Sequence, residues 1–165
     1  MKSTVYFTMQ ASPLGELTLA ATDKGLCGLY FPSHQPAPKR EGWKRDNGPR
    51  FDGARDWLEN FFAGKKPGKL PKLAPLEGTP FQRCVWDALR SIPRGKTTTY
   101  GEIAREIGAE KAVRAVGAAV GRNPLSLFIP CHRVVGKNGS LTGYAGGVER
   151  KKRLLELEGI PASLR

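Results

Sequence analysis

Residues 99–121 read TYGEIAREIGAEKAVRAVGAAVG and carry the clearest signals of local structure in the chain. Thr99 and Glu102 have the spacing of a capping box, in which the threonine hydroxyl accepts from the Glu102 amide and the glutamate side chain reaches back. They predict a short helix that Gly108 closes. Residues 110–120 predict a second helix after a tight turn. Two short helices joined by a turn that contains glycine form a helix-turn-helix.

The second of these helices has an unusual surface composition. Its small residues are Ala112, Ala115, Gly117, Ala118, Ala119 and Gly121, and the basic residues Lys111, Arg114 and Arg122 lie among them. Small residues allow either tight helix packing or a close approach to a phosphate chain. Helices that read the major groove normally carry polar side chains for the base edges, and this helix has almost none. Packing explains the small residues by itself, but Arg114 is a candidate for insertion into a groove or a base stack.

A further helix is expected upstream, because Thr79 and Pro80 supply an N-cap and a proline at the first helical position. This helix ends before Pro93. Its apolar stripe consists of Phe81, Val85, Ala88, Leu89 and Ile92. Such spacing is that of a helix with one face toward a core.

The first half of the chain predicts a small antiparallel sheet and one helix. Residues 4–10, residues 15–21 and an apolar run that ends at Phe31 have the composition of three strands. Residues 32–50 are polar and predict an exposed loop. Residues 52–62 have helical spacing of their apolar side chains and predict an amphipathic helix.

Residues 63–80 predict a linker, because they hold four prolines, three glycines and four lysines. We therefore expect an N-terminal domain over residues 1–75 and a C-terminal domain over residues 76–165. The expected fold class is α+β. A small N-terminal antiparallel sheet with a helix is joined to a helical, winged-helix-like C-terminal domain that contains the helix-turn-helix.

Composition and charge narrow the range of partners. The chain has 165 residues, of which 39% are hydrophobic and 25% charged, as in an ordinary globular protein. No apolar run approaches the roughly 18 to 20 residues of a membrane span, and no signal peptide is visible, so a cytoplasmic protein without a membrane partner is expected. The net charge is +12 and the isoelectric point is about 10. A basic surface can simply aid solubility, but together with the helix-turn-helix it favours binding to DNA.

The three cysteines, Cys27, Cys84 and Cys131, are odd in number and widely spaced, which argues against a disulfide framework or a metal site. Cys27 and Cys84 lie in apolar runs and are expected in the core. Cys131 is different, because His132 and Arg133 follow it directly. Neighbouring positive charge and a base favour the thiolate, which is the nucleophilic form.

Cys131 also lies in a longer pattern that resembles a known family. Residues 130–135, PCHRVV, are preceded by Asn123-Pro124 and followed by GYAGG at residues 143–147. This combination is similar to the signature of the O6-alkylguanine-DNA alkyltransferases, also called methylated-DNA-protein-cysteine methyltransferases. The resemblance covers residues 79–160, whereas the N-terminal region resembles the family only in its general plan.

The resemblance implies a repair reaction by direct reversal, with a single turnover and no cofactor. Such proteins bind duplex DNA, flip an O6-alkylguanine into a pocket and transfer the alkyl group irreversibly to a cysteine. By motif matching Cys131 is the acceptor, His132 takes its proton through a bridging water, and Glu158 orients and charges the histidine. Asn123 matches an asparagine that braces the active-site turn. The expected partner is double-stranded DNA that contains O6-alkylguanine, and the protein is expected to be a monomer.

The resemblance also implies a substrate pocket and a DNA-binding helix. Tyr100 would bond the flipped base, Tyr144 and Lys151 would lie at the pocket, and the carbonyl groups of Cys131 and Val134 would accept from the exocyclic amine of guanine. Ala145 stands where relatives carry serine, and its backbone amide could still donate to the guanine oxygen. Arg114 matches a residue that replaces the extruded base. The residues expected along the DNA are Arg114, Ala115, Gly117 and Arg122.

Three other functions compete with this interpretation. A sensor that binds lesions without repairing them would lack the acceptor cysteine, which is present here as Cys131. A transcription regulator with a helix-turn-helix would leave the cysteine motif unexplained. A cysteine hydrolase would need an oxyanion hole and repeated turnover.

Overall fold

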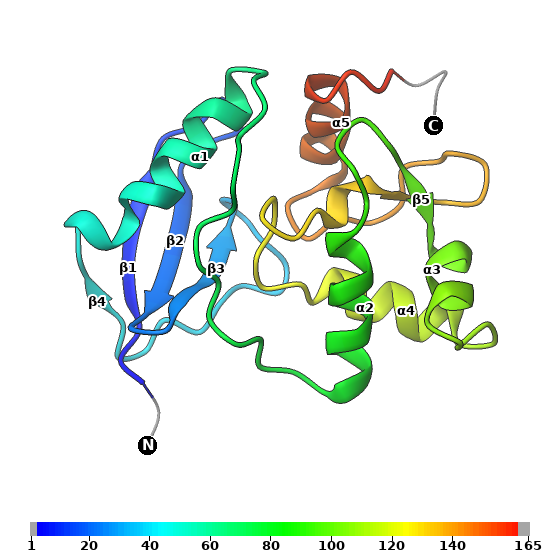
Figure 1. Cartoon of the computed structure of the whole chain (residues 1–165), viewed down its shortest axis with the longest axis horizontal. Coiled ribbons are helices and arrows are strands. Elements are labelled where there is room, and N and C mark those ends of the chain that lie inside the picture. The colour runs from blue at the N-terminus through cyan, green and yellow to red at the C-terminus, as the bar shows by residue number, and fades with distance from the viewer. Residues whose placement is uncertain (1–2, 162–165) are drawn as a thin grey trace. The chain divides into compact units, whose positions relative to one another are not determined.

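In the computed structural model, which describes residues 3–161, the chain folds as two units, Met1–Leu76 and Glu77–Arg165 (Figure 1). The N-terminal unit contains a four-stranded sheet, and most of the helices belong to the C-terminal unit. The α+β fold class predicted from the sequence is confirmed. No helix among the described residues is both long and apolar enough to cross a membrane.

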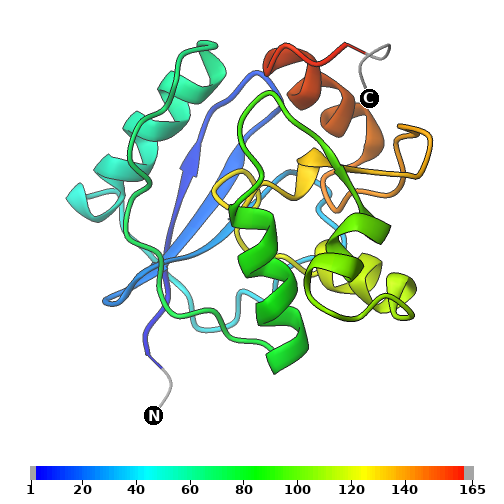
Figure 2. The ribbon, with the colours of Figure 1, turned by 45° about the vertical axis from the view of Figure 1, so that its right-hand side comes forward.

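The N-terminal sheet has the strand order β3-β2-β1-β4, in which β4 is the short strand Lys44–Arg45. Strand β1 spans Tyr6–Gln10, β2 spans Leu17–Thr22 and β3 spans Gly25–Tyr30, and these three pair in antiparallel fashion as expected. Helix α1, Asp52–Phe62, has the predicted bounds and lies along one face of the sheet (Figure 2). Its buried residues Trp57, Leu58 and Phe61 form part of this unit's core.

Two predictions for this unit are wrong in detail. Residues 32–50 are not only an exposed loop, because Lys44–Arg45 form strand β4, parallel to β1, and the 3-10 helix η1 spans Pro49–Phe51. Residues 63–80 are not only a linker either. Leu26 in β3 bonds the carbonyl of Lys72 and the amide of Ala74, at 2.9 and 2.8 Å. Both segments pair through backbone groups, which are available to any non-proline sequence that tertiary structure brings alongside a strand.

The C-terminal unit begins with α2, Pro80–Arg90, which Thr79 caps as predicted. Its capping box is completed by Gln82, whose side chain accepts from the Thr79 amide at 3.0 Å. The buried Trp86 indole donates to the carbonyl of Ala119 at 2.8 Å and thereby ties α2 to helix α4, Val113–Gly121.

The helix-turn-helix consists of α3, Tyr100–Glu106, and α4, Val113–Gly121, which pack against each other and on α2. Thr99 accepts from the Glu102 amide, but the Glu102 carboxylate accepts from the Thr98 hydroxyl and not from the Thr99 amide, so only half of the predicted capping box forms. Helix α4 starts three residues later than predicted. The Ala112 amide bonds the Ala109 carbonyl at 2.8 Å, so these residues form a separate turn before the helix.

The remaining elements position the cysteine motif. Strand β5, Thr98–Thr99, pairs in parallel with β6, Val134–Val135, which directly follows the 3-10 helix η2, Cys131–Arg133. Helix α5, Val148–Leu157, contacts η2. The cysteine motif thus lies beside α5, and its last residues form one strand of the parallel pair.

Candidate active site

Asn123 organises the segment that leads to the cysteine. Its side-chain amide donates to the Ile129 carbonyl at 2.8 Å, and its side-chain oxygen accepts from the Leu125 amide at 3.0 Å. The Ile129 amide also bonds the Leu125 carbonyl at 2.8 Å, which closes the loop on itself. Asn123 is buried, and both the nitrogen and the oxygen of its side-chain amide are hydrogen-bonded within the fold. The segment is therefore held in one conformation up to Cys131.

A buried charged cluster lies beside Cys131. His132 Nε2 is 2.8 Å from Glu158 Oε1, and neither side chain is exposed. Arg133 donates from Nε to Glu158 Oε1 at 3.0 Å, donates to Glu158 Oε2 through its terminal nitrogen, and reaches the Ile92 carbonyl at 2.7 Å. The Glu158 carboxylate therefore accepts from two neighbouring cationic or polar side chains on η2.

The pKa values in this cluster have clear causes. Burial alone would raise the pKa of Glu158, but the hydrogen bonds from His132 and Arg133 outweigh it and lower the pKa to about 2. Burial lowers the pKa of His132, and the nearby Glu158 carboxylate only partly opposes this effect. The carboxylate is thus charged at neutral pH, while the imidazole is a neutral base. With Nε2–H donating to Glu158, Nδ1 carries the basic lone pair.

The expectation that Cys131 rests as a thiolate is wrong. Its side chain is buried, and burial raises the pKa of the Cys131 thiol above its ordinary value. Asn123, the Lys151 ammonium and other neighbours lower this pKa only in part. The guanidinium of Arg133 bonds Glu158 and not the sulfur. Positive charge that is adjacent in sequence is therefore not adjacent to the thiol in space.

Tyr100, Tyr144 and Lys151 gather near the same cysteine. The Tyr100 hydroxyl accepts from the Thr142 hydroxyl at 2.9 Å, and the Lys151 ammonium lies 5.9 Å from the centre of the Tyr100 ring. Lys151 is buried, and burial lowers its pKa to about 8. Burial also raises the pKa of Tyr144 well above its ordinary value, and the Cys131 thiolate would raise it further. The site therefore combines an uncharged thiol with several desolvated polar groups.

Val134 and Ala145 contribute backbone groups at the edge of this region. The Val134 amide donates to the Cys131 carbonyl at the end of η2. That oxygen has a second lone pair, so it remains able to accept from another donor. Ala145 is half-buried in the loop between β6 and α5, which also contains Tyr144.

Helix α4 presents two different faces. Val116, Ala119 and Val120 are buried in the unit's core. The residues of the opposite face are exposed, namely Arg114, Ala115, Ala118 and Arg122, and Gly117 is half-buried beside the Tyr100 ring. Both explanations of the small residues therefore hold for part of the helix. The buried ones allow tight packing, and the exposed ones leave the helix backbone accessible between two arginines.

The sequence analysis missed two residues of the site and placed one cysteine wrongly. Thr142 and Ser126 have no motif of their own, and only the fold brings them to Tyr100 and Cys131. Cys84 is exposed and Cys27 is half-buried, so the expectation that Cys84 lies in the core is wrong. Its neighbours Val85 and Trp86 face inward on α2 instead. Among residues 3–161, no group of three His, Cys, Asp or Glu side chains could hold a metal ion.

Two family models match the chain. Residues 80–160 match the 6-O-methylguanine DNA methyltransferase DNA binding domain, and residues 5–68 match the ribonuclease-like domain of the same family. The chain belongs to the 6-O-methylguanine DNA methyltransferase family. The resemblance predicted for residues 79–160 is confirmed, and membership extends to the N-terminal unit.

Relatives from bacteria and archaea match over nearly the whole chain. A methylated-DNA–protein-cysteine methyltransferase of Haemophilus influenzae is 45% identical over 159 residues, which cover 95% of this chain and 88% of the relative. One from Methanosarcina acetivorans is 47% identical over 156 residues, with 94% and 99% covered.

Solved structures of the family share the fold. The crystal structure of Mycobacterium tuberculosis OGT in complex with DNA is 46% identical, covers 96% of this chain and 97% of its own, and gives a TM-score of 0.87. An O6-methylguanine DNA methyltransferase from Methanococcus jannaschii is 31% identical, with 92% of each chain covered and a TM-score of 0.65.

Proposed function

We propose that this protein repairs DNA by moving the alkyl group of an O6-alkylguanine to its own Cys131. The S–C bond forms as the O6–C bond breaks, and the electron pair of the broken bond stays on the guanine oxygen. The proton that the thiol loses balances the proton that guanine gains. The sulfur is left as a thioether, so each molecule acts once. The acceptor is part of the chain, and no cofactor is needed.

The buried cluster of Cys131, His132 and Glu158 is the observation that carries this proposal. The thiol is protonated at rest, so a base must take its proton during the attack. Burial lowers the pKa of His132, so its imidazole is neutral before the reaction and can accept this proton. The charged Glu158, 2.8 Å from Nε2, then stabilises the imidazolium that forms. The proton passes from the sulfur to His132 through one water. Asn123 holds the loop that presents the cysteine.

The pocket residues supply recognition of the base. Tyr100 bonds the flipped guanine, Tyr144 and Lys151 line the pocket, and the Cys131 and Val134 carbonyl groups accept from the exocyclic amine. The Ala145 amide donates to the guanine oxygen. A hydrogen bond at this oxygen stabilises the charge that develops there as the alkyl group leaves.

The exposed face of α4 is the proposed contact with duplex DNA. Its small residues Ala115, Gly117 and Ala118 let the helix backbone approach the minor groove, and Arg122 neutralises phosphate charge. Arg114 enters the stack in place of the extruded nucleotide. The positive charge of this unit supports the assignment, because residues 81–165 carry 15 basic and 7 acidic side chains. The protein acts as a monomer, with residues 76–165 as the catalytic domain.

The test is the intact mass of the protein after mixing with duplex DNA that contains O6-methylguanine. We expect the mass of one methyl group on the peptide that bears Cys131, and no increment for Cys131→Ser, which still binds DNA. Binding without a mass change in the unaltered protein would indicate a lesion sensor and contradict the proposal. Product release without any alkylated protein would indicate a hydrolase.

A further inference from the structure

Ser126 lies in the loop between Asn123 and Cys131 and is 1% exposed. The loop reverses at Leu127, whose φ of 73° lies in the left-handed region. The reversal pairs Ser126 with Ile129, and the Ser126 carbonyl accepts from the Phe128 amide at 2.9 Å. The backbone of Ser126 is therefore fixed beside the residues that lead into Cys131.

The backbone of Ser126 is hydrogen-bonded within the loop, whereas its side chain is not. Its hydroxyl oxygen is fully buried and makes no hydrogen bond of ordinary geometry with another described residue. A buried hydroxyl without a partner costs free energy, so its presence in a dense core calls for an explanation. Two polar side chains lie close enough to interact with it, the Cys131 thiol and the Tyr144 phenol.

Three other polar side chains act on the sulfur, namely Asn123, Tyr144 and Lys151, and two of them also bond backbone groups. The Asn123 amide bonds the Ile129 carbonyl and the Leu125 amide, and the Lys151 ammonium lies 3.5 Å from the Thr142 carbonyl oxygen. A serine hydroxyl rotates about one bond, so it can turn its proton toward whichever neighbour carries negative charge. Among the neighbours of Cys131, Ser126 is thus a small, adjustable donor.

We propose that the Ser126 hydroxyl donates a hydrogen bond to the Cys131 sulfur as the thiol loses its proton, and that it is a catalytic residue of the transfer. The bond stabilises the thiolate, which burial otherwise disfavours. Alkylation turns the sulfur into a weak acceptor, and the hydroxyl then turns toward Tyr144. This role rests on the function proposed for Cys131, but its effect on the thiol can be measured without DNA.

The test compares the unaltered protein with Ser126→Ala, which removes one oxygen and leaves the remaining volume unchanged. The rate of carbamidomethylation of Cys131 by iodoacetamide is followed against pH by mass spectrometry of its peptide. A hydrogen bond to a charged group should hold the titration midpoint about one pH unit lower, so the midpoint should rise by that amount in Ser126→Ala. Ser91→Ala is the matched control, because the exposed Ser91 hydroxyl only bonds the Ala88 carbonyl at 2.8 Å.

Methyl transfer from O6-methylguanine duplex supplies the second measurement. At about pH 7 the rate should fall on the order of tenfold in Ser126→Ala, with unchanged DNA affinity and thermal midpoint, and the deficit should narrow as the pH rises. A deficit of equal size at every pH, or the same iodoacetamide midpoint in both proteins, overturns the proposal. Failure of the unaltered protein to take up any methyl group would instead refute the proposed function, since the iodoacetamide reaction does not depend on it.

Discussion

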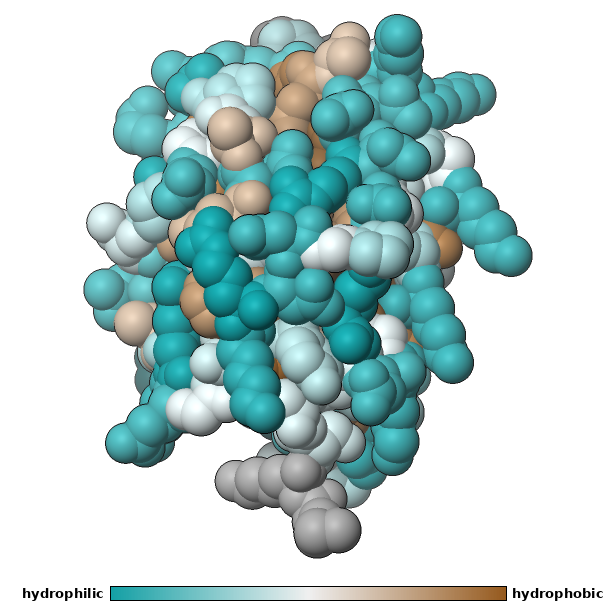
Figure 3. Space-filling model, turned by 90° about the vertical axis from the view of Figure 1, so that its left-hand side faces the viewer, coloured by the Kyte–Doolittle hydropathy of each residue, from teal (hydrophilic) through white to brown (hydrophobic). Residues whose placement is uncertain are grey.

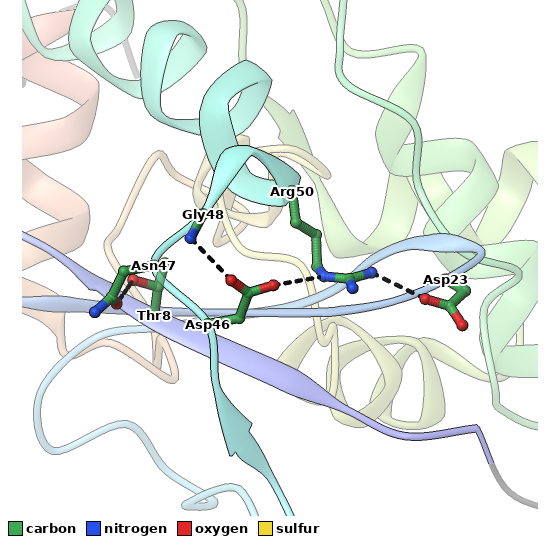
Figure 4. Close-up of polar contacts among 6 residues, drawn as sticks. All are labelled: Thr8, Asp23, Asp46, Asn47, Gly48 and Arg50. Atoms are coloured by element: carbon green, nitrogen blue, oxygen red, sulfur yellow. Dashed lines mark hydrogen bonds and ion pairs between the residues drawn. The ribbon is translucent and has the colours of Figure 1, made fainter.

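The two units each hold an arginine between acceptors, but in opposite surroundings. In the N-terminal unit Arg50 donates to Asp23 at 3.0 Å and to Asp46 at 3.1 Å, and the Asp23 side chain is 83% exposed. Figure 4 shows this network, in which Asp46 also accepts from the Gly48 amide at 2.8 Å. In the C-terminal unit Arg133 and His132 meet the Glu158 carboxylate, which is not exposed.

The difference indicates what each network is for. Water and salt screen an exposed ion pair, so the Arg50 network mainly orders the turn between β4 and α1. Hydrophilic residues predominate on the face of the molecule that Figure 3 shows. Desolvation makes a buried carboxylate expensive, and a well-packed apolar group would often serve stability better. The Glu158 cluster is therefore best explained by the charge that it places beside His132.

Replacing Glu158 should slow the reaction more than replacing any residue of the exposed Arg50 network. Glu158→Gln removes the charge that stabilises the imidazolium and leaves Arg133 without its carboxylate. We expect the transfer rate to fall by at least about tenfold with little change in DNA affinity, and the unfolding free energy to fall by about 3 kcal/mol. Asp46→Asn is the matched control and should leave the rate unchanged. Equal rates for Glu158→Gln and the unaltered protein would remove Glu158 from the mechanism.

The ionised state of Glu158 should also make the stability of the fold depend on pH in acid. The folded pKa of Glu158 is about 2, below the value of about 4.3 in an unfolded chain. A lowered pKa stabilises the fold at all pH values above the unfolded pKa, and this contribution is lost as the pH falls from about 4 to about 2. Urea unfolding should therefore show a loss on the order of 3 kcal/mol over this range, and a smaller loss in Glu158→Gln. Parallel curves for the two proteins would mean that Glu158 is not held ionised by its partners.

Arg114 is a charged residue that is exposed, like Arg50, but it has a proposed role in the reaction. Arg114→Ala should slow repair of methylated duplex by about tenfold or more, because flipping a base costs a few kcal/mol. The reaction with free O6-benzylguanine needs no flipping and should change by less than about threefold.

Arg90→Ala is the control for Arg114→Ala, since it removes one exposed charge from the same unit. Measuring both variants at several salt concentrations separates the loss of a phosphate contact from the loss of base replacement. A parallel fall of the duplex and free-base rates would show that Arg114 supports the active-site fold.

Local patterns predicted the elements that local interactions determine. The amphipathic period of residues 52–62 gave the bounds of α1, and Thr79-Pro80 gave the start of α2. Strand β4 was missed because Lys44 and Arg45 have no apolar pattern, and their pairing depends on backbone groups of β1. The start of α4 was placed too early because Ala109–Ala112 has good helix formers but folds as a turn.

In the candidate site, too, sequence motifs predicted some features, and others depend on the tertiary structure. The motif around Cys131 and the distant Glu158 were predicted from the family resemblance, and the fold brings His132 and Glu158 into contact. The protonation state of Cys131 could not be predicted from the residues next to it in the sequence, because burial of the thiol has the largest effect on its pKa. Ser126 was not found either, because its relation to Cys131 arises only when the loop reverses at Leu127.

The stoichiometry of methyl transfer tests the central claim most directly. A fixed amount of protein is mixed with increasing amounts of duplex that contains O6-methylguanine, and both repaired guanine and methylated protein are counted. If Cys131 is the acceptor and is consumed, both quantities should level off together at about one per protein molecule. Repair that continues past one equivalent, or repaired guanine without matching methyl on Cys131, would contradict the account.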